Sequence, residues 1–265
     1  MRKYIAVAAI QFRAQMVYRF DVIITALSAV WRVLFAWILW GAIFAGRDEV
    51  GGFTFQAMLS YYVIDSFFST LDISWNVAEE VSRRIREGTF SKYMVIPSDP
   101  QFHFLSQSFG TGGYYGLFAA LAAMASSLAF GISHVFTSSL PNILAAVAIF
   151  LLGTVFMSSF NFFVGIWAFK FQDMGFLLYT FPAILRFFKG EFVPLSLLPD
   201  ALEYSLRFIP FTHIAYTPTM LLINRMDLTE GLIAFAVLSA WTFGMLAVSR
   251  LTYRRMRTKY EGVGL

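Results

Sequence analysis

The sequence predicts an all-α polytopic membrane protein with six transmembrane helices, and the prediction rests on composition and hydropathy. Of its 265 residues, 58% are apolar and only 14% are charged, and the mean hydropathy is +0.65. An average soluble domain has about 25% charged residues, and a soluble chain this apolar would expose large apolar patches to water. Disorder needs low hydrophobicity and high charge, so it is excluded too. The lack of cysteine removes disulfide frameworks, Cys-ligated zinc, iron–sulfur clusters and thiol catalysis.

Residues 1–20 are expected to form an amphipathic helix in the membrane interface rather than a span or a signal peptide. Four basic residues interrupt the stretch, namely Arg2, Lys3, Arg13 and Arg19. Its apolar residues recur in steps of three and four, at Ile5, Ala9, Phe12, Met16 and Phe20. This period places them on one helical face, as in helices that lie in the plane of the interface.

Four spans follow, because a bilayer core about 30 Å thick requires roughly 20 predominantly apolar helical residues. They are residues 22–45, 53–75, 104–131 and 140–169. Asp99-Pro100 precedes the third span and is typical of a helix start, with Asp as the N-cap and Pro at the first helical position. The fourth span is long enough to tilt in the membrane.

The C-terminal part is less regular. Residues 174–190 are apolar but short and contain Pro182, and they are expected to form the fifth span. Residues 191–224 are interrupted by Pro194, Pro199, Pro210 and Pro218. They are expected to form an external re-entrant segment, because such backbone is tolerated at membrane depth only where protein or water covers it. The last span is expected at 231–251.

An even number of spans places both termini on one face. Most of the 20 Lys and Arg residues lie on that face, and Arg32 lies within the membrane. The opposite face has only Arg47, Arg186, Lys189, Arg207 and Arg225. The positive-inside rule therefore makes both termini cytoplasmic. The basic stretch that flanks the last span is interpreted as an anchor to membrane lipid, not as a nucleic-acid site.

The polar insertion after the second span contains a short helix, at residues 76–88. Val77, Val81 and Ile85 form one apolar stripe, and Gly88 follows as a C-terminal stop signal. Glu79–Arg83 and Glu80–Arg84 are i,i+4 pairs in the favoured order. Such a helix suits docking into a groove of a partner. The alternative is a solvated helix that only packs on the face of the bilayer.

With these features the chain resembles the permease subunits of ABC-2 type exporters, in a subgroup of poorly characterised bacterial permeases. The resemblance covers nearly the whole chain, including the interfacial helix and the six spans. Its clearest motif is the insertion Arg83-Arg84-Ile85-Arg86-Glu87-Gly88-Thr89-Phe90-Ser91-Lys92-Tyr93. Two further segments, Val193-Pro194-Leu195-Ser196-Leu197-Leu198-Pro199 and Phe208-Ile209-Pro210-Phe211, precede the last span.

The resemblance implies a permease that forms an export path in the bacterial plasma membrane and is driven by two copies of a separate ATPase. A second permease, identical or homologous, would complete the path. The helix at 76–88 would be the coupling helix, which contacts the ATPase and moves with its conformational change. Its contacting residues would be Val77, Glu79, Glu80, Val81, Arg83, Arg84, Ile85, Arg86, Glu87 and Gly88.

The chain has no G-x-x-x-x-G-K-[ST] loop, since Gly88-Thr89-Phe90-Ser91-Lys92 lacks both the spacing and the strand context. We therefore expect a non-catalytic subunit that binds no cofactor, with ATP and magnesium held by the partner. His103, His134 and His213 have no metal-ligand spacing, so no metal site is expected. The sequence does not identify the substrate, and it does not distinguish a permease homodimer from a heterodimer.

Four polar residues are candidates for the substrate path, namely Arg32, Asp65, Asp72 and Asn161. Arg32 and Asp65 each lie ten residues from the expected cytoplasmic end of their span, or about 15 Å. Charges at such depth are costly and usually paired, so we expect an Arg32–Asp65 ion pair. Three roles are open for this pair: it would fix the packing of the two helices, line the substrate path or form part of a proton relay.

Two rival functions remain. An ATP-independent carrier coupled to an ion gradient would use Asp65 as its ion site. An intramembrane enzyme would need several polar catalytic groups at one depth, and the sequence does not contain such a cluster.

Overall fold

The computed structural model describes residues 2–17, 19–132 and 137–259. Within these ranges the chain is helical, and the only β pairing is an isolated bridge between Val50 and Phe53. The all-α prediction is therefore confirmed. The α-helices are α1 (Arg2–Gln15), α2 (Arg19–Ile43), α3 (Phe55–Leu71), α4 (Trp75–Arg86), α5 (Ser91–Val95), α6 (Pro100–Ala129), α7 (Leu140–Ile166), α8 (Phe181–Phe188), α9 (Asp200–Leu206), α10 (Tyr216–Leu222) and α11 (Leu228–Met256).

Three helical segments of the described ranges are long and apolar enough to cross a membrane. They are Phe20–Ile43, Leu140–Phe169 and Leu228–Met256. They coincide with the first, fourth and last expected spans. α3 has 17 residues, and the first half of the 30-residue α6 is rich in Ser, Gly and Gln. These two helices pack against each other and against α2.

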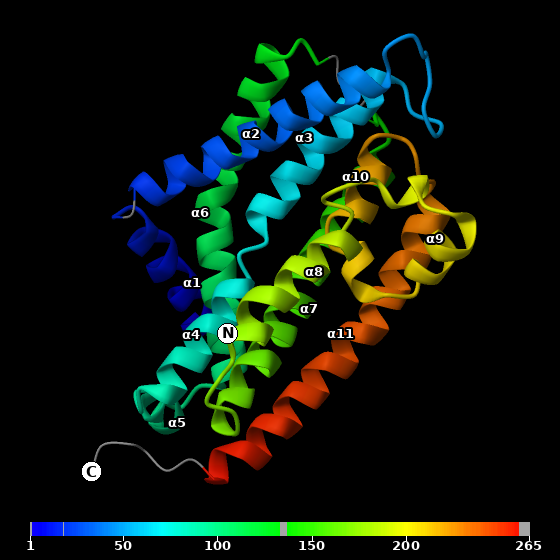
Figure 1. Ribbon diagram of the computed structural model, residues 1–265. Coiled ribbons are helices and arrows are strands. Elements are labelled where there is room, and N and C mark those ends of the chain that lie inside the picture. Colours follow the sequence, from blue (N-terminus) through cyan, green and yellow to red (C-terminus); the bar gives the residue numbers. More distant parts are fainter. Residues whose placement is uncertain (1, 18, 133–136, 260–265) are drawn as a thin grey trace.

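The helices form two groups that meet along α6 and α7 (Figure 1). α1, α2, α3 and α6 pack together, and α7 packs against α4, α10 and α11. α4, α5 and the C-terminal end of α11 lie at one end of the molecule, and the loop at 44–54 lies at the other (Figure 1). Much of the protein's basic charge therefore gathers at the α4 end.

Local capping explains where the long helices begin. The Asp99 side chain accepts a hydrogen bond from the Gln101 backbone N at 3.0 Å, and Pro100 is the first residue of α6, so the predicted start is confirmed. Asp227 and Glu230 form a capping box at the start of α11. Each cap satisfies backbone N–H groups that have no partner within their helix.

The N-terminal helix α1 is shorter than expected and lies along α6. The backbone N of Asp99 donates a hydrogen bond to the Tyr4 hydroxyl at 3.1 Å, and Phe12 meets Tyr114 edge to face. Between these contacts Gly110 lets the two backbones approach each other. A Cβ atom on Gly110 would lie 2.3 Å from the carbonyl oxygen of Ala8.

The expected fifth span at 174–190 is not one regular helix. Its helical part consists of a five-residue π-helix, Phe176–Thr180, followed by the eight-residue α8. These residues reach roughly 20 Å at 1.5 Å per residue, which is less than the thickness of a bilayer core. The segment ends at Lys189, whose ammonium lies 2.6 Å from a carboxylate oxygen of Asp72.

Residues 191–224 form short helical pieces. α10 packs against α7 and α3, and the turn at Pro210–His213 also packs against α7, whereas α9 is largely exposed. Besides α9 and α10 they include two 3-10 turns, Leu195–Leu197 and Pro210–His213. Side chains satisfy carbonyl groups of this irregular backbone. The Tyr61 hydroxyl donates to Gly190 O at 2.8 Å, the Tyr62 hydroxyl donates to Phe192 O at 2.7 Å, and His213 Nε2 bonds to Arg207 O at 3.0 Å. Much of this irregular backbone therefore has its carbonyl groups satisfied by the protein, while α9 stays exposed.

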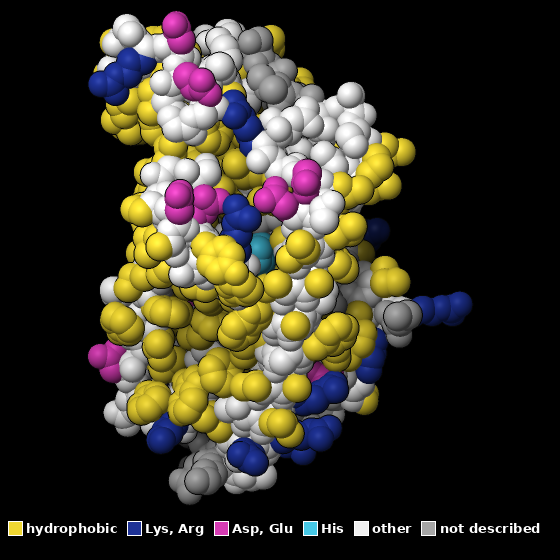
Figure 2. Space-filling model, turned by 90° about the vertical axis from the view of Figure 1, so that its right-hand side faces the viewer, with side chains coloured by type: hydrophobic (Ala, Val, Ile, Leu, Met, Phe, Trp, Pro, Cys, Tyr) yellow, Lys and Arg dark blue, Asp and Glu magenta, His cyan; other side chains and the backbone are white. Residues whose placement is uncertain are grey.

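The outer surface of α11 is apolar over most of its length. Figure 2 shows this face, with an apolar belt below a group of charged side chains and basic side chains near its lower end. The exposed apolar side chains of α11 are Leu232, Ile233, Phe235, Trp241, Phe243, Val248 and Leu251. An apolar belt of this kind suits contact with lipid tails.

The α1–α6 contact can be tested with two glycines of the same helix. Gly110→Ala should lower the unfolding free energy by about 1–3 kcal/mol, because its methyl group must displace the α1 backbone. Gly113→Ala is the matched control, since its Cβ would meet only the Phe12 ring at 3.7 Å. That variant should be neutral or slightly stabilising, because Ala favours helices over Gly. Equal melting temperatures of the two purified variants would contradict the close contact.

Candidate functional site

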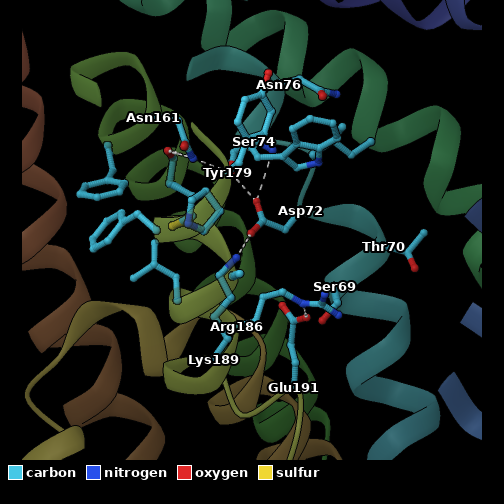
Figure 3. A pocket seen from close by; sticks show the side chains of 18 of the residues that line it. Ser69, Thr70, Asp72, Ser74, Asn76, Asn161, Tyr179, Arg186, Lys189 and Glu191 are labelled. Atoms are coloured by element: carbon cyan, nitrogen blue, oxygen red, sulfur yellow. Dashed lines mark hydrogen bonds and ion pairs between the residues drawn. The ribbon is translucent and has the colours of Figure 1, made fainter. Parts of the chain in front are cut away.

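A polar cavity of about 620 Å³ lies between α2, α3, α7 and α8 (Figure 3). Its charged lining residues are Arg32, Asp72, Arg186, Lys189 and Glu191, and its uncharged polar residues include Ser69, Thr70, Ser74 and Asn161. A volume of this size lies within the range of small-molecule sites. A charged hollow among membrane helices is costly and is usually kept for function.

The centre of the cavity is the junction between α3 and α4. There the helix breaks at residues 72–74, and Asp72 accepts hydrogen bonds from Lys189 Nζ at 2.6 Å and from the Ser74 hydroxyl at 2.5 Å. Asn161 of α7 donates through Nδ2 to Ser74 Oγ at 3.2 Å. The Asp72 and Lys189 side chains are only 6% and 11% exposed. This network connects α3, α7 and the residue that follows α8 (Figure 3).

Two more charged contacts complete the site. Arg186 Nε lies 2.7 Å from Glu191 Oε2, which pairs a half-exposed guanidinium with a buried carboxylate. On the other wall, Arg32 Nη2 donates to Thr70 Oγ1 at 3.1 Å and to Ser66 O at 3.4 Å. Among the residues that the structure describes, Arg32 has no carboxylate at ion-pair distance.

Three of the four predicted path residues meet in this cavity, namely Arg32, Asp72 and Asn161. Asp65 does not line it, and its Oδ1 atom is buried with no hydrogen-bond partner. The expected Arg32–Asp65 contact is not formed, because Arg32 bonds to Thr70 instead, and the two charges attract each other only from beyond ion-pair distance. The second span was expected to run to Trp75, whereas α3 already ends at Leu71 and Trp75 belongs to α4.

The sequence analysis missed Arg186, Lys189 and Glu191 as members of the site. Arg186 and Lys189 were assigned to the external face, but they line the cavity. The error came from treating 174–190 as a complete span, which would carry its end across the membrane. The short apolar stretch before Arg186 was the signal that this helix is shorter than a complete span.

The apolar stripe of α4 lies inside the protein. Val77, Val81 and Ile85 are buried in one cluster with Phe162 and Ile166 of α7. α4 approaches α7 closely at Gly165, where a Cβ atom would lie 2.8 Å from Val81 Cβ. Docking of the stripe into a partner's groove is therefore wrong, and the stripe does not pack on the bilayer either.

The opposite face of α4 is polar and accessible. Arg83, Arg86 and Glu87 are exposed, and Glu79 and Glu80 are half-buried. The Glu80–Arg84 pair is confirmed, with Arg84 Nε 2.5 Å from Glu80 Oε1. Arg83 pairs with Glu80 and Glu87 rather than with Glu79, and its hydrogen bond to Glu80 raises the pKa of Arg83. Gly88 ends the helix with a φ of 75°, which favours glycine.

A second hollow of about 400 Å³ adjoins the first at the α4 end of the molecule. It is lined by polar residues of α1, α4 and α6, among them Gln11, Gln15, Glu79, Gln107 and Ser108. Ile73, Asn76 and Tyr115 line both hollows. Polar surface therefore extends from the α4 end to the cavity between the helices.

The described residues contain no group of three or more His, Asp or Glu side chains that could hold a metal ion. His213 bonds to Arg207 O through Nε2 and to the Thr217 hydroxyl through Nδ1, so it holds buried backbone in place. His103 stacks edge to face on Tyr93. His134 lies outside the described residues.

The Asp72–Lys189 pair can be tested by comparing single and double substitutions. Lys189→Met should lower the unfolding free energy by about 3 kcal/mol, because it leaves a buried carboxylate without its counter-ion. Asp72→Asn/Lys189→Met removes both charges and should unfold at a higher temperature than Lys189→Met alone. Arg83→Gln, at an exposed ion pair, should cost less than about 1 kcal/mol. Additive losses in the double variant would show that the two side chains are not coupled.

Comparison with known proteins agrees with this architecture. Residues 30–264 match the family model described as "ABC-2 family transporter protein". No curated protein and no solved structure matches the chain. The family model covers most of the chain, from the middle of α2 to α11, and includes every residue that lines the cavity except Thr25 and Ser28. The protein therefore belongs to the ABC-2 transporter family of membrane proteins.

Proposed function

We propose that the chain is the permease subunit of an ABC-2 type exporter and forms the substrate path, while a separate ATPase supplies the energy. The observation that supports this function best is the polar cavity among the apolar helices of an ABC-2 family member. The second hollow extends the polar surface toward the α4 end. A path of this kind gives a substrate polar contacts at membrane depth.

In the proposed topology the chain crosses a bacterial plasma membrane six times, with both termini in the cytoplasm. α1 lies at the cytoplasmic interface, and α2, α3, α6, α7 and α11 provide five crossings. The fifth crossing in chain order is discontinuous, because α8 reaches only part of the way and residues 191–224 form the external re-entrant segment. The basic charge at the α4 end supports this orientation.

The proposed contact with the ATPase is the polar outer face of α4. Two ATPase copies would serve two permeases, identical or homologous, and would hold the ATP and magnesium, so this chain would have no catalytic role. On this face Arg83, Arg86 and the following Glu87 are exposed, and Glu79 is half-buried, so a partner can reach their charges. Charged faces of this kind select partners and fix their register.

The packing of α4 would transmit a displacement of this helix to the cavity. Its inner face is fixed to α7 through Val81 and Gly165, so α4 and α7 would move together. Only residues 72–74 separate α4 from α3, and Asp72 and Ser74 both line the cavity. ATP-driven motion of the ATPase would therefore change the cavity first at the Asp72–Lys189 pair, between an inward-open and an outward-open state.

The second permease would cover the open side of the cavity. Exposed side chains of α2 and of the Phe176–Phe188 segment line that side, including Ser28, Tyr179 and Arg186. Two permeases facing each other would enclose polar groups that a single chain leaves beside lipid. This supports a dimeric path.

The ATPase contact can be tested by reversing charges on α4. Arg83→Glu/Arg86→Glu should reduce the ATPase that co-purifies with the permease by roughly tenfold or more, because like charges would meet across the contact. Arg47→Glu, in the loop at the opposite end, is the matched control and should retain the ATPase. If both variants retain it equally in a pull-down from membranes, α4 is not the coupling helix.

An ion-driven carrier is the rival function, and the buried carboxylate of Asp65 is the observation that favours it. Transport measured in reconstituted vesicles distinguishes the exporter from the carrier. The ATPase-driven exporter requires ATP and should retain most of its transport in Asp65→Asn. Transport that needs only an ion gradient and disappears in Asp65→Asn would favour the carrier.

A further inference from the structure

The charges that line the cavity are unequal in number. Arg32, Arg186 and Lys189 face Asp72 and Glu191. Lys189 pairs with Asp72 and Arg186 pairs with Glu191. Arg32 is left with only neutral partners, the Thr70 hydroxyl and the Ser66 carbonyl. The cavity therefore holds one cation, Arg32, that no lining carboxylate contacts, because Asp65 and Glu191 attract it only from beyond ion-pair distance.

An unneutralised guanidinium is expensive at membrane depth. Arg32 lies about 20 Å into α2, counted from the N-terminal end of the helix at 1.5 Å per residue, and it is half-buried. Intramembrane charges are normally paired, and an arginine has several N–H donors that suit a phosphate or carboxylate. Two neutral hydrogen bonds fix the position of Arg32 but leave its guanidinium without an acidic group in direct contact. An anionic ligand group would compensate it.

The rest of the lining is apolar and lies mainly on α7 and the Phe176–Phe188 segment. It includes Met157, Phe160, Val164, Leu177, Phe181 and Leu185. Phe160 and Phe181 lie against each other with ring centroids 6.1 Å apart. The charged groups of the cavity thus adjoin an apolar wall wide enough for an alkyl chain or a ring.

We propose that this cavity binds an anionic amphiphile, with its acidic group on Arg32 and its apolar part along the wall that includes Phe160. The inference rests on the proposed transport function and names the substrate class of that path. A cationic amphiphile would meet an additional like charge. A small hydrophilic anion would leave the apolar wall in contact with water.

The test uses the protein's lack of cysteine. Ser28→Cys would place a single, accessible thiol of this chain in the cavity wall, and its rate of labelling by the neutral reagent N-ethylmaleimide would report occupancy. The purified complex of permease and ATPase would be tested with hexyl phosphate, hexyltrimethylammonium and inorganic phosphate at equal ionic strength. The measured quantity is the concentration that halves the labelling rate.

Hexyl phosphate should halve the rate at a concentration at least tenfold below that of either other probe. Adding Arg32→Gln should raise this concentration about tenfold, as expected for the loss of one charge-assisted hydrogen bond. Arg32→Lys keeps the charge and should lose less than Arg32→Gln. Arg47→Gln removes a cation outside the cavity and should have no effect.

Three results would overturn the proposal. Hexyltrimethylammonium could protect as well as hexyl phosphate, inorganic phosphate could match hexyl phosphate, or Arg32→Gln could leave protection unchanged while its labelling rate without ligand stays normal. Co-purification of the ATPase is recorded in the same samples. Its loss in the unsubstituted protein would contradict the exporter function, whereas an intact complex without preference for the anion would contradict only the substrate class.

Discussion

The Asp72–Lys189 ion pair joins two helices that end inside the helical bundle, and the cavity exists because they end there. α3 stops at Leu71 and α8 at Phe188, while α2 and α7 continue past this level. Carbonyl groups at a helix end have no partner within the helix, and hydrocarbon cannot supply one. The polar cavity tolerates such helix ends, because its polar groups can satisfy their carbonyl groups. One buried contact thus explains the breaks in both helices and the polar lining between them.

The same junction, residues 72–74, determines how a movement of α4 would affect the cavity. Val77, Val81 and Ile85 are buried with residues of α7, so a force on the outer face of α4 acts on a packed unit rather than on a loose helix. Packed interfaces tend to have discrete arrangements instead of deforming continuously. The irregular link at 72–74 is where such a unit can rotate relative to α3. Its side chains hold the cavity network together, so such a rotation would alter that network directly.

Hydropathy and capping signals predicted much of the fold, since the limits of α2, α7 and α11 follow from apolar length, and that of α6 from Asp99-Pro100. The depth of single residues was harder to predict, because it depends on where a helix stops in space. Nothing in the apolar sequence 53–75 marks Leu71 as a helix end, so Asp72 was placed within a continuous span although it lies in the break that follows α3. The stripe of α4 was read correctly as a helical face, but periodicity alone does not reveal which neighbour covers it.

The two ion pairs of the cavity differ in how easily a ligand can compete with them. Lys189 and Asp72 are both almost fully buried, and Ser74 adds a further hydrogen bond to the carboxylate. Arg186 is 46% exposed, so its contact with Glu191 is partly hydrated and correspondingly weak. An entering anion would therefore meet Arg32 and Arg186 as available donors, while the Asp72–Lys189 pair stays closed. On this basis the inner pair belongs to the structure that couples α4 to the cavity, and the two arginines belong to the surface that receives the ligand.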